Sequence, residues 1–308
     1  MLRGRRSPRP CSGWRSTCRT ISWTGRRTEA RFRDSERLMF EYLEIEIDER
    51  TGVNRIRLDR AERRNALSGA LVAELKEALA LAEADARVRV IGIGGRGPDF
   101  CAGADLAEVQ ASVEEGVMAS LREAEALGEL FTLLRKLSKP VVAIVHGRAL
   151  AGGCGLATAC DLVLAAESAR FGYPEVRLGF VPAMVTAILR RNLGEKRAFE
   201  LMSLGDTIDA AEASRLGLVN RVCADAEFEA ESAAFLAELA GRSASALALT
   251  KKLLYGTEGQ SFEAAIATGA RVNAVARMTD DCQAGIRRFL ERGGKREKGG
   301  KRKKREGA

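Results

Sequence analysis

The 308-residue chain has no run of about eighteen consecutive apolar residues, the shortest length that spans a bilayer as a helix. We therefore expect no membrane span. The chain also has a single histidine, His146. One imidazole cannot supply a zinc cluster, so no metal site is predicted. The sequence identifies no catalytic partner for His146, and we expect this residue to be structural.

The cysteines show no pairing pattern. Their number, seven, is odd, and the closest pair in the body of the chain, Cys154 and Cys160, lacks CxxC spacing. Unpaired cysteines are typical of a reducing compartment, so we predict a cytoplasmic protein.

The body of the chain lacks a net positive charge, although the whole chain has a net charge of +8. Residues 1–38 contain eleven arginines and no lysine and carry +8, while residues 292–308 carry +7. Subtracting both tails leaves residues 39–291 with about −7. A folded core of this charge is not expected to bind nucleic acid.

The two tails are expected to lie outside the fold. Residues 1–38 lack the apolar segment of a signal peptide and lack a clear amphipathic helix. They could form a transit peptide or bind nucleic acid or an anionic surface, but we favour upstream sequence before a true start at Met39, or a disordered extension. Residues 293–308 form a charge run for which disorder is expected.

The body predicts an α/β fold. A strand pair is expected within residues 40–60, followed by a helix from an N-cap at Ser68 to about Ala84 and a buried strand at Val88–Ile93. Strand, helix and strand predict a right-handed crossover and a parallel pair. A long helix over 113–138 and a strand at 141–145 follow. After Val181 helices dominate, so we expect an α/β core over 39–225 and a helical region over 226–292.

One glycine pattern is a poor match to its usual function. Gly92, Gly94 and Gly97 follow a predicted strand with the spacing of a dinucleotide-binding loop. Pro98 and Asp99 then stand where a helix should already run, and no strand ending in an acidic residue lies about twenty positions on. We therefore do not predict a nicotinamide cofactor site.

Two strand-to-helix passages through small residues are more informative. One runs through Ala102, Gly103 and Ala104, and the other from Gly147 to Gly155. Bare backbone N–H groups at such helix starts can stabilise a developing oxyanion, although glycines that only permit close packing would give the same pattern. Glu175 follows nearby, and shielding by Phe171 and Tyr173 would raise its pKa toward the range of a proton-transfer group.

These motifs give a resemblance to a known family. The chain resembles the enoyl-CoA hydratase/isomerase (crotonase) family through several segments in the expected order: RAERRNALS (60–68), FCAGADL (100–106), KPVVAIVHGRALAGGCGLATACDLVLA (139–165), FGYPEVRLGFVP (171–182), LGDTIDAAEASRLGLVNRV (204–222) and, more loosely, TDDCQAGIRRFLERGGK (279–295). The resemblance implies a spiral of ββα repeats with a C-terminal α-helical trimerisation region. It also implies a homotrimer or a dimer of trimers, and coenzyme A that enters only as part of a thioester substrate, with no other cofactor.

The resemblance assigns residues by position. The oxyanion-hole N–H groups would be those of Ala102 and Gly152, and Glu175 would be the catalytic carboxylate. The residues expected to line the coenzyme A and acyl path are Arg64, Ala66, Leu67, Ala104, Asp105, Leu106, Gly153, Pro174 and Leu178. Either Arg63 or Arg64 is expected to contact the phosphates of coenzyme A.

The chain departs from the family at one position. Hydratases of the family have a second glutamate where this chain has Gly155. Hydration of a 2-enoyl-CoA remains our first expectation, while a Δ3,Δ2-enoyl-CoA isomerase needs only the single base Glu175. Another acid, Glu123 or Glu125, could replace the missing group. A non-catalytic acyl-CoA-binding protein is the alternative of another class.

Overall fold

The structure is a computed structural model and describes residues 40–291. They belong to the second of the two units into which the chain divides, and only this unit is described. The expectations for residues 1–38 and 293–308 lie outside this range.

A six-stranded sheet with the order β1-β2-β3-β4-β6-β9 forms the centre of the fold. Its strands are β1 (Leu43–Asp48), β2 (Val53–Leu58), β3 (Val90–Gly95), β4 (Val141–Val145), β6 (Leu162–Ala166) and β9 (Arg221–Cys223). Only β1 runs antiparallel to its neighbour. The predicted parallel pair is confirmed, because β2 and β3 pair in parallel and α1 lies between them in the chain. The strand expected at 88–93 begins two residues later.

A smaller sheet stands beside it and was not predicted as a sheet. Its strands β5 (Arg148–Leu150), β7 (Arg170–Gly172) and β8 (Thr207–Asp209) lie in the order β5-β7-β8. Each has three residues, too few for a periodic pattern to stand out in the sequence.

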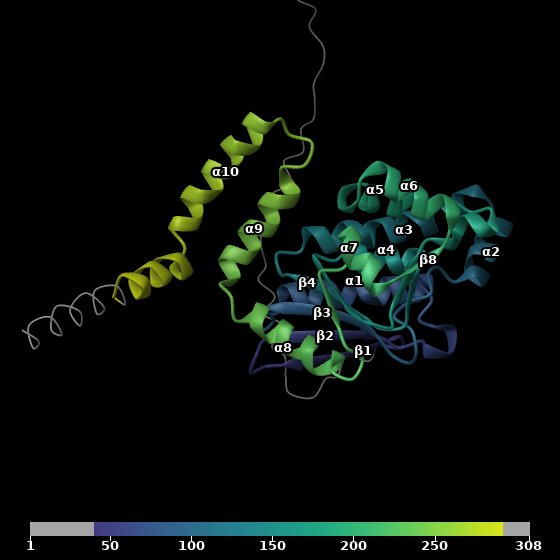
Figure 1. Cartoon of the computed structure of the whole chain (residues 1–308), viewed down its shortest axis with the longest axis horizontal. Coiled ribbons are helices and arrows are strands. Elements are labelled where there is room, and N and C mark those ends of the chain that lie inside the picture. Colours follow the sequence, from purple (N-terminus) through teal and green to yellow (C-terminus); the bar gives the residue numbers. More distant parts are fainter. Residues whose placement is uncertain (1–39, 292–308) are drawn as a thin grey trace, which may run out of the picture. The chain divides into compact units, whose positions relative to one another are not determined.

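Helices connect and cover the strands (Figure 1). The α-helices are α1 (Gly69–Ala84), α2 (Leu106–Glu115), α3 (Val117–Lys136), α4 (Gly152–Ala159), α5 (Ala183–Asn192), α6 (Glu195–Leu204), α7 (Ala210–Leu216), α8 (Phe228–Ala240), α9 (Ala244–Gly256) and α10 (Phe262–Arg277), and the 3-10 helices are η1 (Ala61–Arg63) and η2 (Pro174–Leu178). Residues 280–291 are also helical. Ser68 caps α1 as predicted, since its hydroxyl accepts a hydrogen bond from the Leu71 N–H at 3.2 Å.

The single helix expected over 113–138 is two helices. Gly116, with φ 103°, lies between α2 and α3, and this left-handed backbone ends one helix and begins the next. The earlier helix starts at Leu106, where the side chain of Asp105 accepts a hydrogen bond from the Ala107 N–H.

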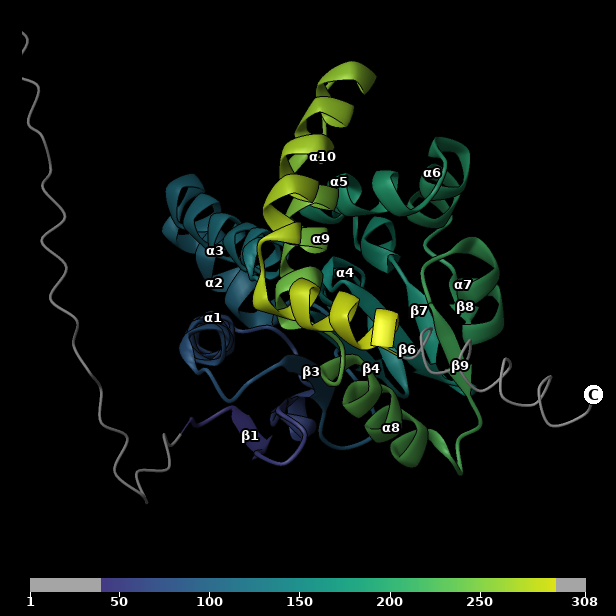
Figure 2. The ribbon, with the colours of Figure 1, turned by 90° about the vertical axis from the view of Figure 1, so that its left-hand side faces the viewer.

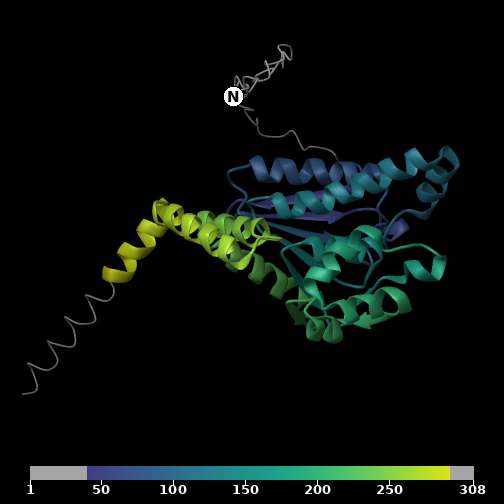
Figure 3. The same ribbon diagram turned by 90° about the horizontal axis from the view of Figure 1, so that it is seen from above.

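The two faces of the large sheet are covered by different helices (Figures 2 and 3). Apolar side chains of α1 and α3 join the largest core cluster, while Leu236 and Ala240 of α8 pack on Val53, Val90 and Val142. Gly92 in β3 makes room for α8, since a β-carbon there would lie 3.0 Å from a methyl of Leu236. α8 is therefore part of the core, although it falls in the region expected to be separate.

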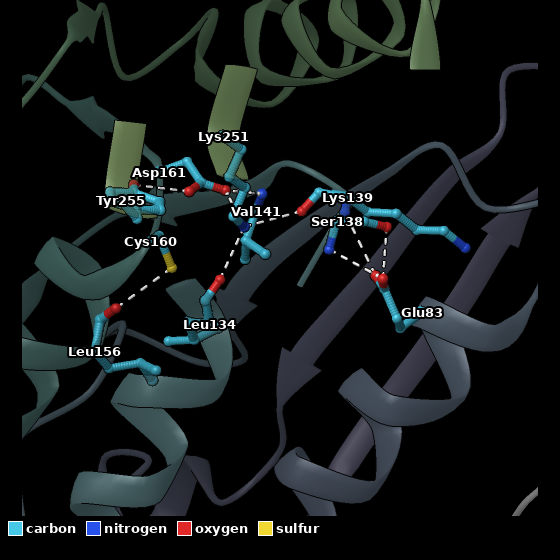
Figure 4. Close-up of polar contacts among 10 residues, drawn as sticks. All are labelled: Glu83, Leu134, Ser138, Lys139, Val141, Leu156, Cys160, Asp161, Lys251 and Tyr255. Atoms are coloured by element: carbon cyan, nitrogen blue, oxygen red, sulfur yellow. Dashed lines mark hydrogen bonds and ion pairs between the residues drawn. The ribbon is translucent and has the colours of Figure 1, made fainter. Parts of the chain in front are cut away.

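A buried ion pair fixes α9 to the core (Figure 4). The ammonium of Lys251 donates to Asp161 at 2.6 Å and to the carbonyls of Leu134 and Lys139 at 2.8 and 3.0 Å. The Tyr255 hydroxyl donates to the other oxygen of Asp161 at 2.8 Å. All three ammonium protons thus have oxygen acceptors, as a buried charge requires.

Helix α10 differs from the other long helices because none of its side chains is buried. Within residues 40–291 no helix is long and apolar enough to cross a membrane.

Candidate active site

Three chain segments far apart in sequence are joined edge to edge. Cys101 forms an isolated parallel bridge with Ala149 of β5, and β5 pairs in parallel with β7. The continuations of these segments are the 101–106 passage, the N-terminus of α4, and η2 with Glu175. The short strands therefore bring both small-residue passages and the predicted carboxylate to one place.

The N-terminus of α4 points its free N–H groups into this place. Ala151 precedes the helix with φ 49° and ψ −126°, a backbone conformation that L-residues rarely adopt, and its N–H donates to the Gly172 carbonyl at 2.9 Å. In the part of the chain that the structure describes, the Gly152 N–H donates no hydrogen bond. The first N–H groups of a helix have no partner within it, so they can receive an anionic oxygen.

The second N–H group is that of Ala104, and the expectation for Ala102 is wrong. The Ala102 N–H is already used, because it donates to the Arg64 carbonyl at 3.0 Å. Ala104 lies opposite Leu67, and the two hydrogen bonds of that bridge involve Gly103 and Asp105 instead. Among residues 40–291 we find no acceptor for the Ala104 N–H. A β-carbon on Gly152 would lie 3.8 Å from the Ala104 nitrogen, so the two free N–H groups are neighbours.

Gly103 permits this approach. Its φ is +105°, and a β-carbon there would lie 2.8 Å from the β-carbon of Ala151 and 3.5 Å from the Gly152 nitrogen. The passage of small residues is therefore needed for the close contact itself, because any side chain at Gly103 would push the two N–H groups apart.

Glu175 is shielded as predicted. It lies in the first turn of η2 and is 8% exposed, and its Oε2 atom is buried without a hydrogen-bond partner in the described range. Burial raises the pKa of this carboxyl above 4.5, and its own backbone N–H opposes that rise in part. A buried carboxyl with a free oxygen and a raised pKa is suited to taking up and returning a proton.

Comparison with known proteins identifies the family. The pattern of the family described as "Enoyl-CoA hydratase/isomerase" matches residues 48–298. The chain belongs to this family. A Thermus thermophilus protein named "Putative enoyl-CoA hydratase" is 43% identical over 235 residues. The match covers 76% of this chain and 93% of that protein. The 2,3-dehydroadipyl-CoA hydratase of Escherichia coli is 35% identical over 237 residues, or 76% of this chain and 91% of that protein.

Solved structures agree with this assignment. The enoyl-CoA hydratase of Mycobacterium smegmatis superposes with a TM-score of 0.78 at 33% identity, covering 82% of this chain and 96% of that one. The crotonase-type α/β fold expected from the sequence is thus confirmed, and the chain is an enzyme of the enoyl-CoA hydratase/isomerase family.

The departure from the family at Gly155 is built into the packing. A β-carbon on Gly155 would collide with a methyl of Val185 in α5 and would lie 3.1 Å from the ring of Phe131 in α3. Both side chains are buried, so the place of a second glutamate is filled by apolar atoms.

The substitute acids differ in position. Glu123 is half-buried and precedes Leu127 by one helical turn, on the same face of α3. Leu127 itself would lie 3.6 Å from a β-carbon on Gly152. Glu125 is exposed. Of the two, Glu123 is therefore on the face that approaches the N-terminus of α4.

The loop expected to bind coenzyme A is held by polar contacts. Arg64 is exposed with φ 52°, the Ala66 carbonyl accepts from Arg60 at 2.8 Å, and Leu67 is buried. Asp105 is paired with Arg60 at 3.0 Å. Burial acts to raise the pKa of Asp105, but the hydrogen bonds from Arg60 and the Ala107 N–H outweigh it and lower the pKa. Asp105 is thus a helix cap and an ion-pair partner that holds the loop.

The remaining predicted residues separate into packing and surface positions. Gly153 is buried against Cys101, and a β-carbon there would collide with the Cys101 carbonyl. Pro174 begins η2 and is half-buried, whereas Leu106 and Leu178 are 61% and 68% exposed. The structure places the Ala104 nitrogen beside Gly152, puts Glu175 on the segment that follows β7, and leaves the two leucines at the surface.

Sequence reasoning missed Asn65. This buried residue has φ 54°, accepts from the Arg60 N–H at 2.9 Å, and donates to the carbonyls of Arg96 and Asp99 at 2.9 and 2.8 Å. It joins the 60–66 loop to the 96–100 loop. The asparagine in this loop could have predicted a turn with positive φ, since asparagine tolerates the left-handed region and its side chain bonds to backbone groups.

The Nε2 atom of His146 lies 2.8 Å from the Gly97 carbonyl oxygen, and a structural role for this residue stays a prediction. Residues 40–291 contain no cluster of three or more acidic, histidine or cysteine side chains that could hold a metal ion.

Proposed function

We propose that this chain hydrates a 2-enoyl-CoA thioester through an enolate. The observation that carries the proposal is the buried, unpartnered oxygen of Glu175, on the turn that follows β7, whose last residue Gly172 accepts a hydrogen bond from the N–H of Ala151, the residue preceding Gly152. The free N–H groups of Ala104 and Gly152 would bind the thioester oxygen, where negative charge develops in the transition state.

The reaction balances with one carboxylate. Ionised Glu175 removes a proton from water, and the water oxygen forms a bond to the β-carbon while the double bond shifts its electrons toward the thioester oxygen. The two N–H groups stabilise this enolate. Protonated Glu175 then gives the proton to the α-carbon, which restores the carbonyl and the ionised carboxylate. Because its pKa is raised, Glu175 releases and regains the proton at smaller cost near neutral pH.

Coenzyme A would lie along the 60–68 and 102–106 segments. These segments are joined by hydrogen bonds of Leu67 with Gly103 and Asp105. The exposed guanidinium groups of Arg63 and Arg64 are suited to the phosphates. Pro174 and Leu178 would border the acyl group. Coenzyme A enters as part of the substrate, and we propose no other cofactor.

The packing at Gly155 favours a second candidate, Δ3,Δ2-enoyl-CoA isomerisation. Val185 and Phe131 leave an apolar wall where hydratases of the family have a second carboxylate. A proton shift between the γ- and α-carbons needs one base that returns the proton, and it needs no water. Apolar side chains in place of a second carboxylate suit that reaction, because it needs no second acid-base group and no bound water.

One experiment separates the candidates. The same preparation is assayed with crotonyl-CoA and with a 3-enoyl-CoA of matched chain length. Turnover of crotonyl-CoA supports hydration. Turnover of the 3-enoyl-CoA alone would overturn hydration and support isomerisation. Binding of both thioesters with turnover of neither would overturn both candidates and leave a non-catalytic acyl-CoA-binding protein.

We also propose that the enzyme assembles as a homotrimer or a dimer of trimers through the helices after α8. The support is the exposed apolar surface of these helices, formed by Leu254, Phe262, Ile266, Val275, Met278, Ile286, Phe289 and Leu290. Such a surface on a helix without buried side chains is typical of an interface. Light scattering is expected to give a trimer or hexamer mass, and a fully active monomer would contradict this.

We also propose a cytoplasmic location and a folded core without a nucleic-acid partner. The cysteines at 101, 154, 160, 223 and 282 are all free thiols, which supports a reducing, cytoplasmic location. The negative charge of residues 39–291 supports a core without a nucleic-acid partner.

A further inference from the structure

The residue two positions before Glu175 is a tyrosine with an unusual setting. Tyr173 is 1% exposed, and its hydroxyl oxygen lies 3.3 Å from the hydroxyl oxygen of Thr158 in α4. Burial raises the pKa of Tyr173 well above 10, so the hydroxyl keeps its proton at any physiological pH. Tyr173 is therefore a neutral hydrogen-bond donor.

The direction of this hydrogen bond follows from the partners of Thr158. The Thr158 hydroxyl lies 2.8 Å from the Cys154 carbonyl oxygen, one turn earlier in α4, and donates its only proton there. It can then only accept from Tyr173. The Tyr173 proton thus points at α4, into a site where both oxygens are buried.

A second hydrogen bond is made by the backbone of Gly172, the residue before Tyr173. The Gly172 carbonyl accepts from the Ala151 N–H at 2.9 Å, immediately before the Gly152 N–H. Pro174, whose ring restricts φ, joins Tyr173 to Glu175. The turn that carries the carboxylate is therefore fastened to α4 by a backbone bond at Gly172 and a side-chain bond at Tyr173.

We propose that Tyr173 is a positioning residue that, through Thr158, holds the Glu175 carboxylate at a set distance from the Gly152 N–H. The proposal rests on the proposed function, in which Glu175 moves the proton. A positioning residue is needed because the Oε2 atom of Glu175 has no hydrogen-bond partner. The backbone that carries Glu175 must then set where the carboxylate lies. Without the Tyr173 bond the turn can move away from α4 and admit bulk water to the carboxylate, in addition to the one molecule that reacts.

The test compares Tyr173→Phe, Thr158→Val and the double variant. Each single change is expected to lower kcat roughly ten- to hundredfold with KM for the thioester unchanged, since small misplacements have effects of this size. The acid limb of the kcat–pH profile should move to lower pH, because water at Glu175 weakens the desolvation that raises its pKa. The double variant should be no slower than Tyr173→Phe alone, since that change already removes the hydroxyl that bonds to Thr158. Thr158→Ser, which keeps the hydroxyl, should restore both readouts.

Tyr255→Phe is the matched control. It removes the hydroxyl of a half-buried tyrosine in α9, which donates to Asp161 (Figure 4), and should lower stability without moving the acid limb. A Tyr173→Phe enzyme with kcat and acid limb within twofold of the parent would overturn the proposal. If that variant does not fold, the difference between Thr158→Val and Thr158→Ser decides it. Full activity in Glu175→Gln would instead remove the proposed function, whatever Tyr173→Phe shows.

Discussion

A methyl group of Val185 occupies the space that a β-carbon on Gly155 would need. The two residues belong to α4 and α5, which pack closely in the core. The neighbours of Gly155 therefore leave no space for a side chain, and a glutamate at this position would require Val185 to move.

This relationship predicts that Gly155→Glu alone destabilises the protein by about 1–3 kcal/mol or more, as overpacking does, and adds no hydratase activity. Gly155→Glu combined with Val185→Ala should relieve the collision. That variant is expected to hydrate crotonyl-CoA at least about tenfold faster than Val185→Ala alone, because a second acid-base group contributes up to 10²–10⁴-fold. Isomerisation of a 3-enoyl-CoA serves as the internal control and should change little. A faster Gly155→Glu single variant would contradict the packing argument.

Glu175→Gln keeps the size of the side chain and removes the titrating proton. We expect kcat to fall by about 10²–10⁴ with thioester binding preserved. Stopped assays measure the first quantity, and calorimetric titration with a saturated acyl-CoA measures the second. Glu125→Gln, on the exposed part of α3, is the matched control and should leave kcat unchanged. Unchanged turnover in Glu175→Gln would move the search to Glu123.

The raised pKa of Glu175 also predicts a dependence of stability on pH. The folded state keeps the proton at pH values where the unfolded carboxyl, with a pKa near 4.5, has lost it. The folded state thus binds more protons, and stability falls as pH rises from about 4.5 through the raised pKa. Glu175→Gln lacks this loss, so its melting temperature relative to the parent should increase across that interval. A difference independent of pH would show that Glu175 titrates normally.

Gly152→Pro removes one of the two proposed N–H donors at the first position of a helix, where proline is well tolerated. A β-carbon there meets Leu67, Leu127 and Ala104 only at ordinary contact distances of 3.5–3.8 Å. We expect kcat to fall by about 10²–10³, as for other single oxyanion-hole donors. Gly152→Ala keeps the N–H and is the control, with circular dichroism to confirm that both fold. Equal activity in the two variants would remove Gly152 from the site.

Lys251→Met tests the attachment of α9. It leaves Asp161 buried without its cation, and breaking a buried pair in this way costs about 3–5 kcal/mol. Urea unfolding should show that loss, and Lys252→Met on the exposed side of the same helix should show little. A loss below about 1 kcal/mol would mean that the pair is weakly coupled to folding.

Much of the fold and part of the site could be predicted from the sequence, because those features are local. The run VVAIV is a strand and Ser68 caps a helix since β-branched residues and short hydroxyls favour these states wherever they stand. The small sheet could not be predicted, because its three-residue strands exist only through their pairing with one another.

The active site shows the same division. The sequence by itself determined that Glu175 would be shielded and that two passages of small residues would present N–H groups. Only the tertiary structure decided that Ala104 and not Ala102 has the free N–H, because the choice depends on hydrogen bonds with Arg64 and Leu67 from a distant loop. Likewise Gly155 reads as a missing carboxylate in the sequence, but its neighbours Phe131 and Val185 come from two other helices. Side-chain packing and hydrogen-bond direction are properties of the folded chain, so no local pattern contains them.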